Sequence, residues 1–133
     1  DEIQAAFLSV KLKYLDREND ARKKIAASYV ANIQNSAISL PEIPTDTNEH
    51  VWHLFVIRTK NRDGLRTYLD SKNISNLIHY PIPIHKQLAY KQFNNLTFPI
   101  TEEIHKEVLS LPVGPIIKQF EYEKVVTVLS LKL

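Results

Sequence analysis

The chain has 133 residues, 44% of them hydrophobic, and its 17 basic and 15 acidic residues leave a formal net charge of +2. This composition predicts one domain, spanning residues 1–133, that can bury a core without disulfides or metal. The lack of cysteine excludes disulfides, thiolate catalysis and cysteine-ligated zinc. The small net charge does not support binding to nucleic acid. No apolar stretch approaches the ~20 residues that cross a bilayer, so we expect a cytoplasmic protein without a membrane segment.

Apolar residues recur at helical spacing between Ile3 and Tyr14, and again between Ile25 and Ile33. The pattern predicts one long N-terminal helix or two helices in line. The stretch DRENDARKK between the two series carries charges of both signs, which indicates a solvated helix face rather than a binding patch. The two prolines of SLPEIPTDTNEH then predict a loop.

The stretch VWHLFVIRT is typical of a strand because it is rich in β-branched and aromatic residues. In that strand Trp52, Leu54 and Val56 would face one way, and Phe55 and Ile57 the other. Both faces are therefore expected to be covered, with Trp52 in the core. The arginine at the end of this stretch, Arg58, is open to two interpretations, a functional contact or a surface ion pair.

A helix is predicted from Asn61 to Lys72, with Asn61 as its N-cap and Leu65, Tyr68 and Leu69 facing inward. ISNLIHY is predicted to be a short strand.

Thr101 is predicted to cap a further helix whose first turn is acidic. Its inward-facing residues are expected to be Ile104, Val108 and Leu109. SLPVGP is predicted to form a short strand and a turn.

The last segment is ambiguous because VVTVLSLKL is rich in β-branched residues, although its apolar residues also fit one helical face. We predict a helix with Tyr122, Val125, Val126, Leu129 and Leu133 on that face. The whole order of elements predicts an α/β or α+β fold, with helices packed on a short, mainly antiparallel sheet.

The run HYPIPIH at residues 79–85 is the strongest candidate for a functional site. Pro81 and Pro83 fix their own φ angles and bias the preceding residues toward extended geometry, so the run is predicted to be extended. His79 and His85 would then face the same side, ~19 Å apart at ~3.1 to 3.3 Å per residue, which is too far for a shared metal. Two interpretations remain open: the wall of a polar ligand site, or a rigid connector whose histidines cap neighbouring elements.

No metal site is predicted, because the histidines elsewhere lack ligand spacing. The two glycines, Gly64 and Gly114, lie in no phosphate-binding loop.

Six separated stretches resemble the C-terminal part of the DegT/DnrJ/StrS family of pyridoxal-phosphate (PLP) aminotransferases, which act on nucleotide-linked sugars. In order they are DEIQAAFLSVKLKYLD, Arg22 with IAASY, HVWHLFVIR, HYPIPIHKQLAY, FPITEEI and LSLPVGP. The resemblance covers essentially the whole chain. It implies the small C-terminal domain of a fold type I aminotransferase whose large PLP-binding domain lies upstream of Asp1.

The resemblance implies that His79 and Tyr80 reach the nucleotide-sugar substrate, and it assigns His85 to the same substrate site. It also implies that PLP and the catalytic lysine belong to the upstream domain, so that this piece alone binds no cofactor and is inactive. Glutamate is the expected amino donor and a homodimer the expected assembly. The alternative is a non-catalytic regulatory or interaction domain that retains the fold, since fold alone does not determine function.

Overall fold

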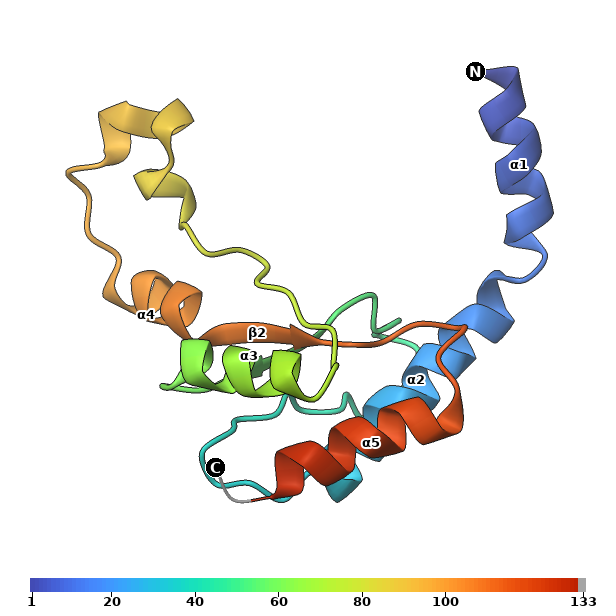
Figure 1. The fold of residues 1–133 in the computed structure, drawn as a ribbon. Helices are drawn as coiled ribbons and strands as arrows, with labels where there is room; N and C mark the ends of the chain where they lie inside the picture. Colours follow the sequence, from blue (N-terminus) through green and yellow to red (C-terminus); the bar gives the residue numbers. More distant parts are fainter. Residues whose placement is uncertain (132–133) are drawn as a thin grey trace.

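The computed structural model describes residues 1–131 of the chain (Figure 1). Its elements are, in order, α1 (Glu2–Leu12), α2 (Leu15–Asn32), β1 (Phe55–Arg58), α3 (Arg62–Ser71), the 3₁₀ helices η1 (Ile84–Lys86) and η2 (Leu88–Phe93), α4 (Pro99–Glu107), β2 (Val108–Leu111) and α5 (Gln119–Ser130). Figure 1 shows a body formed by α2, α3, α5 and the two-stranded sheet. Two arms leave that body: α1, and the segment that carries η1 and η2. Helices packed with a short antiparallel sheet confirm the predicted fold class.

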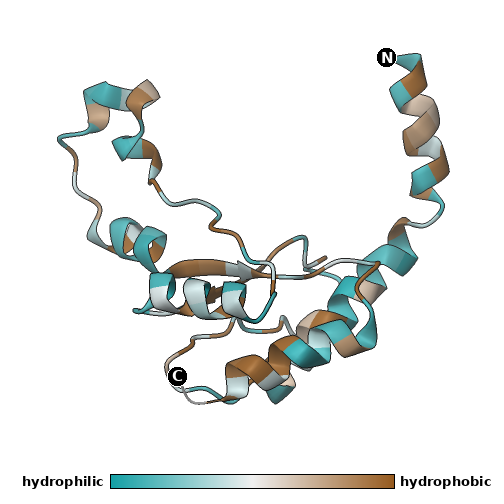
Figure 2. Cartoon of the chain, viewed as in Figure 1, coloured by the Kyte–Doolittle hydropathy of each residue, from teal (hydrophilic) through white to brown (hydrophobic). Residues whose placement is uncertain are grey.

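The N-terminal region forms two helices rather than one. α1 ends at Leu12 and α2 begins at Leu15, after Tyr14 as its N-cap. α2 packs on the body through Ile25 and Tyr29, whereas its charged first half is exposed or half-exposed, as predicted. α1 buries none of its residues, and hydrophobic residues recur along its length (Figure 2). Among the described residues, no helix combines the length and apolarity that crossing a membrane requires.

The sheet is antiparallel, with Phe55 opposite Leu111 and Ile57 opposite Leu109. Because side chains alternate along a strand, these four residues share one face, and all four are buried. Ser110 lies between the two β2 leucines, so its side chain points to the opposite face. That face is the one on which the candidate site is built.

The predicted strand VWHLFVIRT is shorter than expected. Only Phe55–Arg58 is a strand, and Trp52 lies outside it with a positive φ of 54°. The backbone amide of Trp52 donates to Nδ1 of His50 at 2.9 Å instead of to a neighbouring strand, which keeps this residue out of the sheet. Trp52 is nevertheless only 5% exposed and packs against Phe55, so its predicted place in the core is confirmed.

ISNLIHY was also predicted as a strand, and this is wrong beyond a single bridge. Leu77 exchanges two backbone hydrogen bonds with Ser110, at 3.2 and 2.7 Å. No longer ladder forms, because the prolines that follow lack amide donors. The bridge still places the chain against the free edge of β2.

α3 agrees with its prediction, since it begins after Asn61 and buries Leu65 and Leu69. The side chain of Asn61 makes no capping hydrogen bond. It folds over the first turn, where a Cβ on Gly64 would lie 2.5 Å from its Oδ1.

The predicted boundaries of the next helix are wrong at both ends. α4 begins at Pro99 with Phe98 as N-cap, not at Thr101, because proline fits the first position of a helix. It ends at Glu107, so Val108 and Leu109 belong to β2 rather than to the helix. Pairing with β1 across a shared apolar face outweighs the helical spacing of these two residues.

One core joins α2, β1, α3, β2 and α5. In α5 the buried residues are Tyr122, Val125, Val128 and Leu129, which confirms the helical interpretation of this segment. The predicted inward residue Leu133 lies outside the described residues. Tyr29 connects α2 to the end of β2, because its hydroxyl donates to the carbonyl of Pro112 at 2.8 Å. Burial raises the pKa of Tyr29 well above its ordinary value.

Leu129→Ala should destabilise the body strongly, because Leu129 is 0% exposed. A Leu→Ala change at such a position costs about 2–5 kcal/mol through lost burial and the residual cavity. Leu131→Ala is the matched control, since Leu131 is 56% exposed and should change stability by less than about 0.5 kcal/mol. Urea denaturation of both variants measures the difference. Equal losses would show that α5 does not pack as described.

The apolar surface of α1 should make the isolated chain self-associate and bind a hydrophobic dye. Ile3, Phe7, Leu8 and Leu12 are each at least 65% exposed, and large exposed apolar patches are uncommon on monomers. The double variant Phe7→Ser/Leu8→Ser should reduce dye fluorescence and shift sedimentation toward the monomer. A monomeric wild-type chain without dye binding would contradict this expectation.

Candidate functional site

His79 is held against the sheet by a residue of β2. Its Nδ1 forms a 2.8 Å hydrogen bond with the hydroxyl oxygen of Ser110, which projects from the face of β2 opposite the core. The Leu77–Ser110 bridge brings the chain to this point two residues earlier. The imidazole is half-buried, and with Nδ1 engaged its Nε2 remains for another partner.

Tyr80 presents its phenol to solvent, while its backbone is held from α4. The side chain is largely exposed, at 66%, and its ring lies edge-on to the ring of His79 with centroids 5.5 Å apart. The carbonyl oxygen of Tyr80 lies 2.6 Å from Nδ1 of His105. Because a carbonyl only accepts, His105 must carry its hydrogen on Nδ1 and donate.

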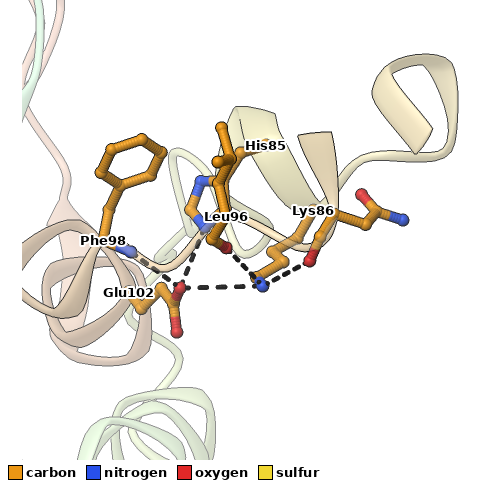
Figure 3. A network of polar contacts seen from close by, with 6 residues as sticks. His85, Lys86, Leu96, Phe98 and Glu102 are labelled. Carbon is orange, nitrogen blue, oxygen red and sulfur yellow. Dashed lines mark hydrogen bonds and ion pairs between the residues drawn. The ribbon is translucent and has the colours of Figure 1, made fainter. Parts of the chain in front are cut away.

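His85 is the most buried of these residues, at 7% exposure, and is paired with a carboxylate (Figure 3). Its Nε2 lies 3.0 Å from Oε1 of Glu102, and its ring meets Phe98 edge-on at 4.9 Å between centroids. An ionised carboxylate only accepts, so His85 carries a hydrogen on Nε2. The same Glu102 oxygen accepts from the Phe98 backbone amide at 3.2 Å, which caps α4.

Lys86 of η1 contacts the backbone that follows η2. Its ammonium donates to the carbonyls of Asn94 and Leu96, both at 2.9 Å, and lies 3.9 Å from Glu102 (Figure 3). These bonds tie the chain after η2 back to η1. Glu102 therefore contacts two residues of η1, His85 and Lys86, and also the backbone amide at the start of α4.

The segment 79–85 is less extended than predicted. Pro83 has extended geometry, with φ −64° and ψ 150°, but the 3₁₀ helix η1 begins directly after it at Ile84. His79 and His85 therefore do not form one row: the first bonds to β2 and the second to α4. The alternative that the histidines hold neighbouring elements describes His85 well.

Two hollows flank the segment. A cavity of about 190 Å³ is lined by His79 and Ser110 and also by His53, Asn76 and Leu77. The Oδ1 atom of Asn76 is buried and has no hydrogen-bond partner among the described residues, whereas its Nδ2 donates to Asp70 at 2.7 Å.

The second hollow measures about 470 Å³ and is lined by residues of η1, η2 and α4. Its walls are mostly apolar, and His85 and His105 are among them.

Arg58 forms an ion pair, in line with the surface ion pair that was one of its two interpretations from the sequence. Its Nη2 and Nε lie 2.7 and 3.0 Å from Oε2 of Glu107, at the end of α4. Arg62 adds a second tie, because it donates to the backbone carbonyl of His105 at 2.9 Å. Both bonds connect α4 to the body.

The described residues contain no group of three or more side chains placed to hold a metal ion. The lysines within residues 1–131 are all exposed or half-buried. The two half-buried ones, Lys23 and Lys86, donate to side-chain and backbone oxygens. None is a desolvated amine, one of the environments that activate a lysine for a Schiff base, so the lysines of residues 1–131 do not fit that linkage to PLP.

Sequence reasoning missed the partners that hold the segment. Ser110, His105 and Glu102 lie 17 to 31 residues away from the groups they bond, and nothing in the local pattern pairs them. One signal was available: Glu102 and His105 are three apart on a helix, which places them on one face.

Comparison with known proteins identifies relatives along almost the whole chain. The model of the DegT/DnrJ/EryC1/StrS aminotransferase family matches residues 1–130. A dTDP-3-amino-3,6-dideoxy-alpha-D-galactopyranose transaminase of Aneurinibacillus thermoaerophilus is 53% identical over 126 residues, covering 95% of this chain and 34% of that protein.

Two solved structures share the fold. Streptomyces venezuelae DesV, in complex with a ketimine intermediate, superposes with a TM-score of 0.89 at 38% identity, covering 98% of this chain and 36% of that one. NtdA from Bacillus subtilis, with bound cofactor PMP, gives a TM-score of 0.77 at 30% identity over 88% of this chain and 28% of its own. The chain therefore spans about a third of the length of these relatives.

Acid should release the contacts of Glu102. The hydrogen bond from His85, the Phe98 amide and the charge of Lys86 together hold the pKa of Glu102 below its usual value of 4.5. Because the folded structure favours ionised Glu102, the contacts of this carboxylate stabilise the arm above pH 4.5. This contribution is lost as the pH falls through the pKa of Glu102 in the folded protein. The NMR shift of the Phe98 amide should therefore titrate with a midpoint below 4.5.

The controls are two charge-neutral variants. In Glu102→Gln the titration of the Phe98 amide should disappear, whereas Glu103→Gln, one position along on the exposed side of α4, should leave it intact. A titration that persists in Glu102→Gln would assign the proton to another group.

Proposed function

Because the chain belongs to the DegT/DnrJ/EryC1/StrS aminotransferase family, we propose that the full-length protein transfers an amino group to a nucleotide-linked keto sugar with PLP as cofactor. The 53% identity to a transaminase named for a dTDP-linked 3-amino-3,6-dideoxygalactose supports a substrate of that class. Glutamate is the proposed amino donor and a homodimer the proposed assembly, both on the family resemblance. PLP is assigned to the part of the full-length protein outside residues 1–131.

In this proposal the present domain supplies the sugar side of the active site. The observation that carries it is the His79–Tyr80 pair: an imidazole fixed by Ser110 beside a cavity, next to a tyrosine residue that is 66% exposed. The imidazole and the phenol can hydrogen-bond to phosphate oxygens or sugar hydroxyls. Little ordering is left to be done on binding, because Pro81 and Pro83 restrict the backbone between the anchored ends.

His85 has a different part in this proposal. Its burial and its bond to Glu102 support a role in holding the segment in place. A direct contact between His85 and substrate stays a prediction.

The size of the cavity limits what this domain can do alone. About 190 Å³ is smaller than the roughly 300–1,000 Å³ typical of small-molecule sites. A nucleotide sugar therefore needs further walls, which the proposal assigns to the rest of the full-length chain or to a second copy. The buried Oδ1 of Asn76 is an acceptor at the edge of this cavity that a bound hydroxyl or water can satisfy.

His79→Ala in the full-length protein should lower kcat/KM for a dTDP-linked 3-keto-6-deoxyhexose. A lost hydrogen bond to a charged group costs roughly 1.5–3 kcal/mol, which corresponds to a fall of about tenfold to a hundredfold. The half-reaction with glutamate should change little, because it does not use the sugar side of the site. Pro81→Ala should have a smaller effect on the sugar half-reaction by loosening the segment.

Single-turnover measurements of the two half-reactions separate the outcomes. Equal losses in both would mean that His79→Ala damages the fold, and no loss in either would leave the segment as a connector only. A wild-type protein that binds the sugar nucleotide without transferring an amino group would favour the alternative of a non-catalytic regulatory domain.

A further inference from the structure

α4 holds both ends of the segment 79–85. Near the first end, His105 donates from Nδ1 to the carbonyl of Tyr80 at 2.6 Å. At the second end, Glu102 accepts from Nε2 of His85 at 3.0 Å. Residues three apart lie on the same side of a helix, so a single face of α4 makes both contacts.

The segment depends on such contacts because it cannot form a ladder of its own. Pro81 and Pro83 have no amide hydrogen, which leaves the backbone between the two ends mainly with acceptors. The Tyr80 carbonyl directly precedes the first of these prolines. The Tyr80 carbonyl therefore needs a hydrogen-bond donor from another part of the chain, and such a bond fixes the backbone at Tyr80.

α4 is itself firmly placed. Arg58 of β1 holds Glu107 at 2.7 Å, and the Thr59 amide donates to the Glu107 carbonyl at 3.1 Å. Arg62 of α3 holds the carbonyl of His105. The backbone of His105 is thus bonded to the body, and its imidazole bonds to Tyr80. His105 can therefore hold the Tyr80 backbone in a fixed position relative to the body.

We infer that His105 and Glu102 are positioning residues for the substrate side of the site, with His105 setting the orientation of the Tyr80 phenol through the Tyr80 carbonyl. The inference rests on the proposed function and extends it to two residues outside the segment. Neither needs to touch the substrate. Their effect should appear in the affinity for the nucleotide sugar and not in the reaction with the amino donor.

The test replaces His105 by residues that do or do not keep a donor at the place of Nδ1. In the full-length protein, His105→Ala should raise KM for the dTDP-linked keto sugar about three- to tenfold, as expected for one lost hydrogen bond. kcat and the glutamate half-reaction should stay unchanged. His105→Asn, whose amide nitrogen can take the place of Nδ1, should restore KM, whereas His105→Gln, whose longer amide corresponds to Nε2, should not.

Glu102 has a matched control on the same helix. Glu102→Ala should raise KM for the sugar, and Glu102→Gln, which keeps an acceptor oxygen, should recover most of the loss. Glu103→Ala removes an exposed carboxylate one position away and should behave as wild type. An equal effect of Glu102→Ala and Glu103→Ala would overturn the role of Glu102.

A second readout does not depend on turnover. With fluorotyrosine incorporated, the resonance assigned to Tyr80 by its loss in Tyr80→Phe should be sharp in wild type and His105→Asn and broadened in His105→Ala and His105→Gln. An active wild type with unchanged KM and an unchanged Tyr80 resonance in His105→Ala overturns the positioning role alone. A wild type without transaminase activity overturns the proposed function, and in that case the Tyr80 resonance still tests the positioning role of His105.

Discussion

The shortage of backbone donors between His79 and His85 is the constraint around which the candidate site is built. A run with two prolines in seven positions cannot join a sheet as a full strand. The chain makes a single bridge to β2 at Leu77, two residues before the run, and then leaves the sheet. The remaining contacts of the run come from side chains on other elements, and this is why a hydroxyl, an imidazole and a carboxylate converge on it.

These three anchors come from one continuous stretch of chain. Glu102 and His105 lie on α4, and Ser110 lies on β2, which follows α4 without a loop. The direct junction at Glu107 fixes the helix and the strand relative to each other, and Arg58 binds the same Glu107 from β1. The position of the candidate site is thus determined at the place where α4 becomes β2.

The sequence predicted the body better than it predicted the site. Apolar spacing identified α3 and α5, and the family resemblance identified the fold, because both depend on many residues at once. The sequence predictions failed where contacts with other parts of the chain determine the local structure. Val108 and Leu109 fit a helical face, but they pair with β1. Trp52 fits a strand, but its amide donates to His50 and it lies outside the sheet. The prolines predicted an extended run over residues 79–85, but the 3₁₀ helix η1 begins within it at Ile84. The bonds to Ser110, His105 and Glu102 join residues far apart in sequence, which local patterns do not encode.

The continuity from α4 into β2 bears on how such a protein can change its substrate over time. A recombination event that exchanged residues 79–111 between two relatives would carry the substrate-facing segment together with all three of its anchors. The incoming piece would join its new host through the pairing of β2 with β1 and the bridge between Ser110 and Leu77. The bonds from Arg58, Thr59 and Arg62 to the C-terminal part of α4 would complete the junction. A new substrate specificity could thus be acquired together with the residues that hold the substrate-facing segment in place.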